Sequence, residues 1–201
     1  MLDIEPAARR MTRLFDAVTD DRLADPTPCV DYTLGDLLAH VSALSVAFAA
    51  AAAKSTGPEA SAPPAPDAAH LGGDWRSRVP AELTDLVAAW QAPGAWEGMT
   101  RVGGLDLPGE VAGRVVLTEL VIHGWDVARA TDRPYDGDPT SLEESITFVA
   151  EMAAADNGSE SPFGPPVAVA DDAPLLDRLI GLSGRDPHWS APRHASARDA
   201  R

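Results

Sequence analysis

The feature that most constrains the fold is the helical spacing of apolar residues along most of the chain. Apolar side chains that recur every three or four residues form one face of an amphipathic helix, which must be buried against other helices. This spacing predicts helices over 5–23, 33–54, 75–92, 108–131, 139–155 and 172–183. We therefore expect an all-α protein built as a four-helix bundle, with extra short helices toward the C-terminus.

The connection between the second and third predicted helices is long. Residues 57–73 contain four prolines, so this stretch cannot be helical. A helix of about 22 residues is ~33 Å long, and about 17 extended residues reach ~55 Å, so the link could carry the chain back along the bundle. The second and third helices would then run parallel, in an up-down-down-up order. The alternative is a surface loop with no topological role.

None of the remaining connections marks a domain boundary. The Gly-rich stretch 94–107 predicts a short hairpin or an ordered loop, and the Pro- and Asp-rich stretch 157–173 predicts a loop. Residues 191–201 predict a disordered tail. Since we find no repeat and no shift of composition, we expect one helical domain over residues 1–190.

Charge and composition exclude several classes of protein. The formal net charge of -15, without a basic patch, argues against binding to nucleic acid. Cys29 is the single cysteine, so an internal disulfide and a cysteine-based zinc site are both excluded. The apolar stretch 34–53 contains His40 and is too polar to be a convincing membrane span. With an acidic N-terminus unlike a signal peptide, we expect a cytoplasmic protein, for which a homodimer is possible.

Two of the five histidines lie within apolar helices, where an unpartnered imidazole would be costly. They are His40 on the second predicted helix and His123 on the fourth. Glu119 precedes His123 by four residues, so both side chains emerge from one face of the helix. By itself this pair is equally well interpreted as an ion pair across one helical turn. His40 favours a metal, since it would supply a third ligand from another helix.

Two histidines and one carboxylate are a ligand set for Zn²⁺ and equally for Fe²⁺. Three protein ligands leave a coordination position for water or substrate, which favours catalysis over structural support. Nickel stays open as well. The other histidines, at 70, 188 and 194, fall in loops or in the tail and are expected to be solvated.

Several neighbouring residues have two interpretations each. Asp36 could accept a hydrogen bond from His40, but it more often caps a helix that begins beside Thr33. Asp126 could support His123 or act as a general base, or it could pair with Arg129 on the helix surface. Cys29 could face the site, although a buried inert thiol is more common. The same preference for the core applies to two tryptophans, Trp90 and Trp125.

Three segments together resemble a known family. They are residues 26–40 (PTPCVDYTLGDLLAH), residues 119–131 (ELVIHGWDVARAT) and residues 184–189 (GRDPHW). They are similar to the metal-binding proteins related to mycothiol-dependent maleylpyruvate isomerase, within the wider DinB-like superfamily. The resemblance extends over nearly the whole chain.

This resemblance implies a DinB-like four-helix bundle that binds a divalent metal, commonly zinc, through His40, Glu119 and His123. It also implies mycothiol, a low-molecular-weight thiol, as cosubstrate. Tyr32 stands where the family commonly has tryptophan. The isomerase has a further C-terminal domain with catalytic residues and no counterpart in this sequence, so we do not expect maleylpyruvate isomerisation itself.

Three functions follow from these patterns. The first is a metal- and thiol-dependent transferase or isomerase that acts on a small electrophilic substrate, because a metal deprotonates a bound thiol to a nucleophilic thiolate. The second is a non-catalytic metal-binding or ligand-sensing bundle. The third is a structural bundle in which Glu119 and His123 form only an ion pair. The sequence names neither the electrophile nor the metal.

Overall fold

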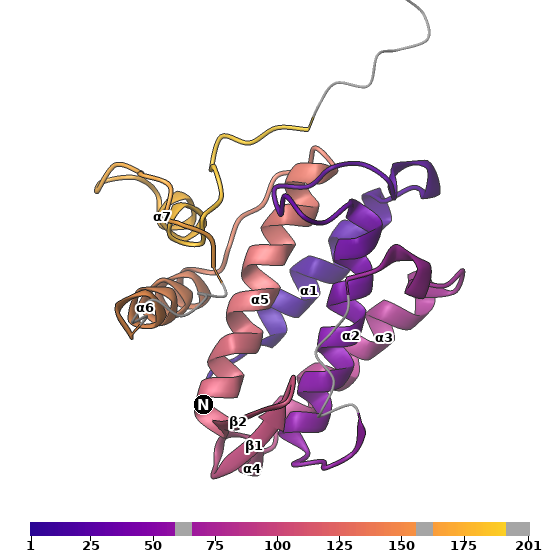
Figure 1. Cartoon of the computed structure of the whole chain (residues 1–201), viewed down its shortest axis with the longest axis vertical. Coiled ribbons are helices and arrows are strands. Elements are labelled where there is room, and N and C mark those ends of the chain that lie inside the picture. The colour runs from indigo at the N-terminus through magenta and orange to yellow at the C-terminus, as the bar shows by residue number, and fades with distance from the viewer. Residues whose placement is uncertain (59–65, 156–162, 192–201) are drawn as a thin grey trace, which may run out of the picture.

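The computed structural model describes residues 1–58, 66–155 and 163–191. Within these residues the chain is mostly helical, with one small antiparallel hairpin (Figure 1). The longer helices are α1 (Glu5–Leu14), α2 (Leu34–Ala52), α3 (Trp75–Trp90), α5 (Gly109–Ala130), α6 (Pro139–Ala155) and α7 (Leu175–Leu182). Between α3 and α5 lie the short helix α4 (Pro93–Trp96) and the strands β1 (Met99–Val102) and β2 (Leu105–Pro108).

The predicted helices are confirmed in place, with two corrections. The protein is not purely α-helical, because Met99 pairs with Pro108 and Val102 with Leu105 in the hairpin. Of the two alternatives for 94–107, the hairpin is therefore correct. Residues 157–162 of the predicted loop and 192–201 of the predicted tail lie outside the described residues.

The first helix is also shorter than the predicted 5–23. α1 ends at Leu14, and two short 3-10 turns follow, at Phe15–Ala17 and Asp20–Arg22. Between these turns Val18 is extended, with φ −89° and ψ 118°, and its side chain is buried. Its carbonyl accepts a hydrogen bond from Arg76 of α3 at 2.9 Å. This contact with another helix satisfies a carbonyl that would otherwise bond within a continued α-helix.

Hydrogen bonds between α2 and α3 show that these two helices run in the same direction. Ser42 donates to Glu82 at 2.6 Å, and further along both helices Trp90 donates to the carbonyl of Phe48 at 3.1 Å. α3 therefore begins at the same end of the bundle as α2, and residues 59–65 of the connection between them lie outside the described residues.

α5 runs antiparallel to α2. The first half of α2 contacts the later half of α5, where His40 lies 3.3 Å from Glu119. At the other end Lys54, which follows α2, donates to the carbonyl of Ala95, which precedes α5. α1 packs against α5 and α3. Figure 1 shows α6 and α7 on one side of α5, with α2 and α3 on the other. The hairpin and α4 close one end of this arrangement.

The core lies between these helices and is formed by large, fully buried side chains. They are Met11 from α1, Leu34, Leu37 and Leu38 from α2, Trp75, Leu83, Leu86 and Trp90 from α3, and Leu117 and Leu120 from α5. Trp125 is buried as well, so the expectation of core positions for Trp90 and Trp125 is confirmed. Burial of these apolar faces is what holds the helices together.

α2 is long and apolar enough to cross a membrane by length and composition alone, with a mean hydropathy of 1.6 in its most apolar window. In the fold, 67% of that window is buried against the rest of the chain. A core helix passes the same test, so its apolar character is accounted for by packing.

A capping box fixes the start of α2. The Thr33 hydroxyl accepts a hydrogen bond from the backbone N–H of Asp36, and the Asp36 carboxylate accepts from the backbone N–H of Thr33 at 3.0 Å. Two backbone N–H groups at the helix start are thereby satisfied. The position of this first turn determines where His40 lies one turn later.

We expect Thr33→Ala to lower the free energy of unfolding by about 1 kcal/mol, because the Asp36 N–H loses its acceptor. Urea denaturation followed by circular dichroism would measure this. Thr147→Ala is a matched control, since Thr147 is exposed within α6 and its hydroxyl donates to the Glu143 carbonyl of its own helix. Equal midpoints for the two variants would contradict the role assigned to the cap.

Candidate metal centre

The three predicted metal ligands meet at one point between α2 and α5. One carboxylate oxygen of Glu119 lies 3.3 Å from Nε2 of His40 and 3.1 Å from Nε2 of His123. One potential ligand atom from each residue lies within 4.8 Å of the other two. The imidazole rings of the two histidines are 4.9 Å apart, nearly perpendicular. Residues 79 positions apart in the chain are thus brought together as the sequence predicts.

The local structure explains this convergence. Glu119 and His123 are one turn apart on α5, so their side chains share a face. α2 crosses that face with its first half, which carries His40. His123 is buried, and the side chains of His40 and Glu119 keep 13% and 23% exposure. The ligand atoms can therefore be reached from outside, while the bundle fixes the helices that carry them.

Charge and hydrogen bonding make Glu119 and His123 a strongly coupled pair. Burial opposes the charge on Glu119, but hydrogen bonds from His123 and His40 outweigh it and hold the pKa of Glu119 well below its usual range. Burial also opposes a proton on His123, yet hydrogen bonds to Asp126 and Glu119 raise its pKa to about 9. Without a metal, a proton on the imidazole therefore occupies the place that a cation would take.

Asp126 lies behind His123 and is fully buried. Its carboxylate can only accept, so the Nδ1–H of His123 donates to it, at 2.9 Å. On its other side Asp126 pairs with Arg185, whose Nε lies 2.9 Å from Oδ1 and whose Nη2 lies 3.0 Å from Oδ2. Of the two alternatives for Asp126, the pairing with Arg129 is therefore not the one formed, because Arg129 donates to the backbone carbonyl of Trp189 instead.

Asp126 thus takes the supporting position that its spacing from His123 suggested. With Nδ1 donating to Asp126, Nε2 is the ring nitrogen that faces Glu119: it donates to that carboxylate while protonated, and it is the atom that would bind a metal once it has lost this proton. Asp126 is not among the residues that line the cavity. A role for it as a general base stays a prediction.

Asp36 does not support His40. Its carboxylate accepts from Thr33 and from the backbone N–H of Ala68 at 2.8 Å, so the capping interpretation is confirmed. Nδ1 of His40 is buried and has no hydrogen-bond partner within the part of the chain that the structure describes. The two histidines therefore differ at Nδ1, which is bonded to a carboxylate in His123 and has no described partner in His40.

His70 and His188 are exposed, as expected of solvated histidines, and His194 lies outside the described residues.

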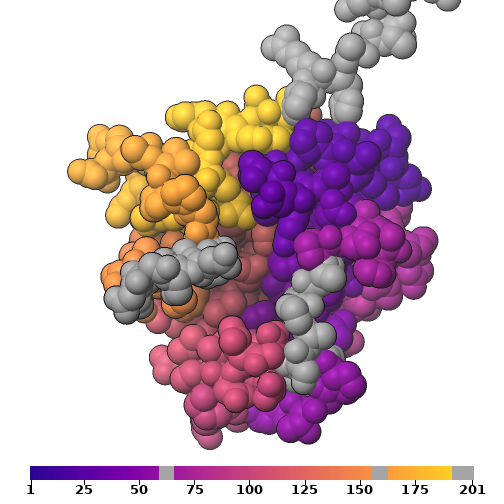
Figure 2. Space-filling model, in the orientation of Figure 1, coloured from indigo at the N-terminus to yellow at the C-terminus, as the bar shows by residue number. Residues whose placement is uncertain are grey.

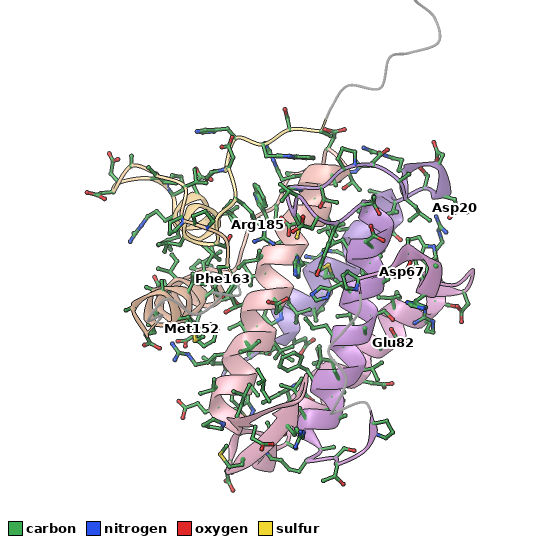
Figure 3. The ribbon with its side chains drawn as sticks, in the orientation of Figure 1. Asp20, Asp67, Glu82, Met152, Phe163 and Arg185 are labelled. Atoms are coloured by element: carbon green, nitrogen blue, oxygen red, sulfur yellow. The ribbon has the colours of Figure 1, made fainter. Side chains whose placement is uncertain are left out.

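A cavity of about 170 Å³ opens over the three ligand side chains. Besides these side chains, its wall contains Cys29, Tyr32, Ile122, Phe163 and Arg185. The Tyr32 ring lies 5.5 Å from the ring of His40. In Figure 3, Arg185 lies beside the later half of α5. The site is thus bounded by the bundle, by the loop before α2 and by the segment after α7.

Cys29 faces the site, as one interpretation of the sequence has it, and is an inert thiol, as the other has it. It lines the cavity, and yet burial, followed by the negative charge of Asp126, raises the pKa of its thiol to about 11. The thiol therefore stays protonated at neutral pH and is a poor nucleophile.

Sequence reasoning did not single out Arg185 or Phe163. Arg185 falls within the quoted segment 184–189, so the motif was visible although its role was not. Phe163 belongs to no helix and no motif, so no sequence signal could have found it.

We expect Asp126→Asn to lower the free energy of unfolding of the metal-free protein by about 3 kcal/mol, because Arg185, whose side chain is 12% exposed, would lose its counter-charge. Urea denaturation in the presence of a chelator would measure the change. Asp132→Asn is the matched control. The Asp132 side chain is 73% exposed and forms a 3.7 Å ion pair with Arg22. Its φ of 55° is a conformation that asparagine tolerates. Its change should stay below about 0.5 kcal/mol, and a similar loss in both variants would contradict this role of Asp126.

Comparison with known proteins gives relatives and a family for the chain. Two uncharacterized proteins of Mycobacterium tuberculosis, one from strain CDC 1551 / Oshkosh and one from strain ATCC 25618 / H37Rv, are each 27% identical to the chain over 169 residues. The alignments cover 84% of this chain and 87% of each relative. No solved structure matches the chain. Residues 4–128, which include all three candidate ligands, match the family described as the mycothiol maleylpyruvate isomerase N-terminal domain, and the chain belongs to that family.

Proposed function

We propose that this protein binds one divalent metal ion, zinc in preference to nickel or iron, and is a mycothiol-dependent transferase or isomerase for a small electrophilic substrate. The observation that carries the proposal is the convergence of His40, Glu119 and His123 beneath an open cavity. The name of the matched family supports the choice of thiol.

The side chains present fit a zinc ion. At zinc–ligand distances of about 2.0–2.1 Å, tetrahedral geometry places neighbouring ligand atoms about 3.3 Å apart. The Glu119 oxygen already lies at about this spacing, 3.3 Å and 3.1 Å, from the two histidine nitrogens, and the three ligand atoms all lie within 4.8 Å of one another. Asp126 behind His123 supplies the hydrogen-bonded carboxylate that commonly orients a metal-binding histidine.

A bound zinc ion would supply Lewis acidity that keeps a thiol ionised at neutral pH. Cys29 also lines the cavity, but it is not one of the three residues whose ligand atoms converge. The cavity of about 170 Å³ is smaller than typical ligand pockets of about 300–1,000 Å³. Only the reactive ends of the thiol and of the electrophile would therefore enter it, between Tyr32 and Phe163.

The remaining parts of the proposal concern the whole chain. The parallel course of α2 and α3 and the antiparallel course of α2 and α5 support a DinB-like up-down-down-up bundle. We infer that residues 1–190 act as one metal-binding domain in the cytoplasm. The net charge of -15 supports a small-molecule partner over nucleic acid.

Metal content tests the first half of the proposal. Untagged wild-type protein should carry about one divalent ion per chain by elemental analysis, and His123→Ala should carry almost none, since loss of a ligand opens the site. His70→Ala is the matched control, because His70 is an exposed histidine that contacts Asp67 and not the cluster. Absence of metal from wild-type protein reconstituted with zinc would refute the proposal.

Thiol binding tests the second half. We expect mycothiol to shift the visible absorption bands of the cobalt-substituted protein, because a thiolate ligand changes the field at the metal. S-methylated mycothiol, which has no ionisable S–H, should leave the bands unchanged. If mycothiol has no effect while metal is bound, the thiol-dependent function is wrong, and a metal-binding or ligand-sensing role takes its place.

A further inference from the structure

The position of Arg185 is set by the way α7 ends. Gly184 has φ +81°, the left-handed conformation that commonly ends a helix, and its N–H donates to the carbonyl of Gly181 at 3.1 Å. The N–H of Arg185 donates to the carbonyl of Ile180, also at 3.1 Å. These two bonds form a Schellman motif, which fixes the backbone of Arg185 next to the last turn of α7.

Glycine is required at this position for a second reason. A Cβ atom on Gly184 would lie 2.8 Å from backbone atoms of Gly164. The segment after α7 is therefore packed closely against the segment before it. In Figure 2 this C-terminal segment, in yellow, meets the indigo residues that precede α2. Arg185 and Cys29 accordingly line the same cavity.

From this position the Arg185 side chain reaches Asp126 on α5. Nε and Nη2 of the guanidinium contact both oxygens of the carboxylate, at 2.9 to 3.1 Å. The same carboxylate accepts from Nδ1 of His123 at 2.9 Å. Arg185, Asp126 and His123 thus form a continuous chain of charge-assisted hydrogen bonds that ends at a metal ligand.

We propose that Arg185 is a positioning residue of the metal centre, which acts through Asp126 to hold His123 in the orientation that binds metal. This inference rests on the proposed function. Asp126 has no exposed side-chain surface, and its described partners are His123 and Arg185. A buried carboxylate without its cation is strongly disfavoured, so loss of Arg185 would lead Asp126 to become hydrated, to move or to be neutralised. Each of these changes disturbs its bond to His123.

A simpler role for Arg185 would be to anchor the C-terminal segment. Arg129 provides the comparison, because it also holds that segment, through the backbone carbonyl of Trp189. Arg129 does not contact Asp126 or line the cavity. Replacing Arg129 therefore loosens the segment without breaking the contact between Arg185 and Asp126.

The test compares zinc affinity, measured by competition with a chromophoric chelator, in wild type, Arg185→Met and Arg129→Met. We expect the dissociation constant to rise about 10-fold to 100-fold in Arg185→Met, the usual effect of removing a group that orients a ligand. In Arg129→Met it should rise by less than about 2-fold. The visible spectrum of the cobalt form should change in Arg185→Met and stay as in wild type in Arg129→Met.

The conservative pair Arg185→Lys and Arg129→Lys keeps the test decisive if a methionine variant misfolds. Lysine keeps the charge but cannot contact both carboxylate oxygens in parallel, so Arg185→Lys should bind zinc more weakly than Arg129→Lys and more strongly than Arg185→Met. If Arg185→Met does not fold, the lysine pair decides by the same criterion.

The two proposals fail in different ways. Wild-type protein that does not bind zinc would overturn the proposed function and this inference with it. Zinc binding by wild type with unchanged affinity in the Arg185 variants would overturn this inference alone. An equal loss in the Arg129 and Arg185 variants would also overturn it, since anchoring of the segment would then explain the effect.

Discussion

The contact between α2 and α5 through two imidazoles and one carboxylate is the interaction on which the site depends. Polar groups in an apolar helix interface are costly unless each finds a partner. Glu119 resolves this cost in the metal-free chain, because one of its oxygens lies within hydrogen-bond reach of both His40 and His123. The atoms that satisfy one another are also those that could bind a cation. The helix packing and the candidate metal centre therefore have the same origin.

Around this contact the site is completed by parts of the chain outside the bundle. The family match covers residues 4–128, which include the three ligands and Asp126. Arg185 and Phe163 come from beyond that range and close the cavity from the side of α7. The cavity wall thus combines the helices that carry the candidate metal centre with later segments that bring charge and shape.

The fold was predicted best where periodicity is long and regular. α2 and α5 begin and end within two residues of the expected positions. Their apolar faces and their starts depend on residues close together in the sequence, so local patterns predict them. The prediction failed where a distant contact competes with local preference. α1 ends at Leu14 while the apolar spacing continues, since Val18 turns its carbonyl toward Arg76 of α3. Single-sequence reasoning cannot weigh such a contact before the helices are placed.

By itself, the sequence determined which helices form and which polar side chains occur on their apolar faces. Spacing along one helix is a local property, so Glu119 and His123 could be paired from the sequence. Only the tertiary structure decided which partners those groups have. Asp126 pairs with Arg185 and not with Arg129, although Arg129 is only three residues away in the sequence. The end of α7 brings the guanidinium of Arg185 to the buried carboxylate of Asp126. Contacts of that kind depend on how distant segments pack together, and no local sequence pattern encodes that packing.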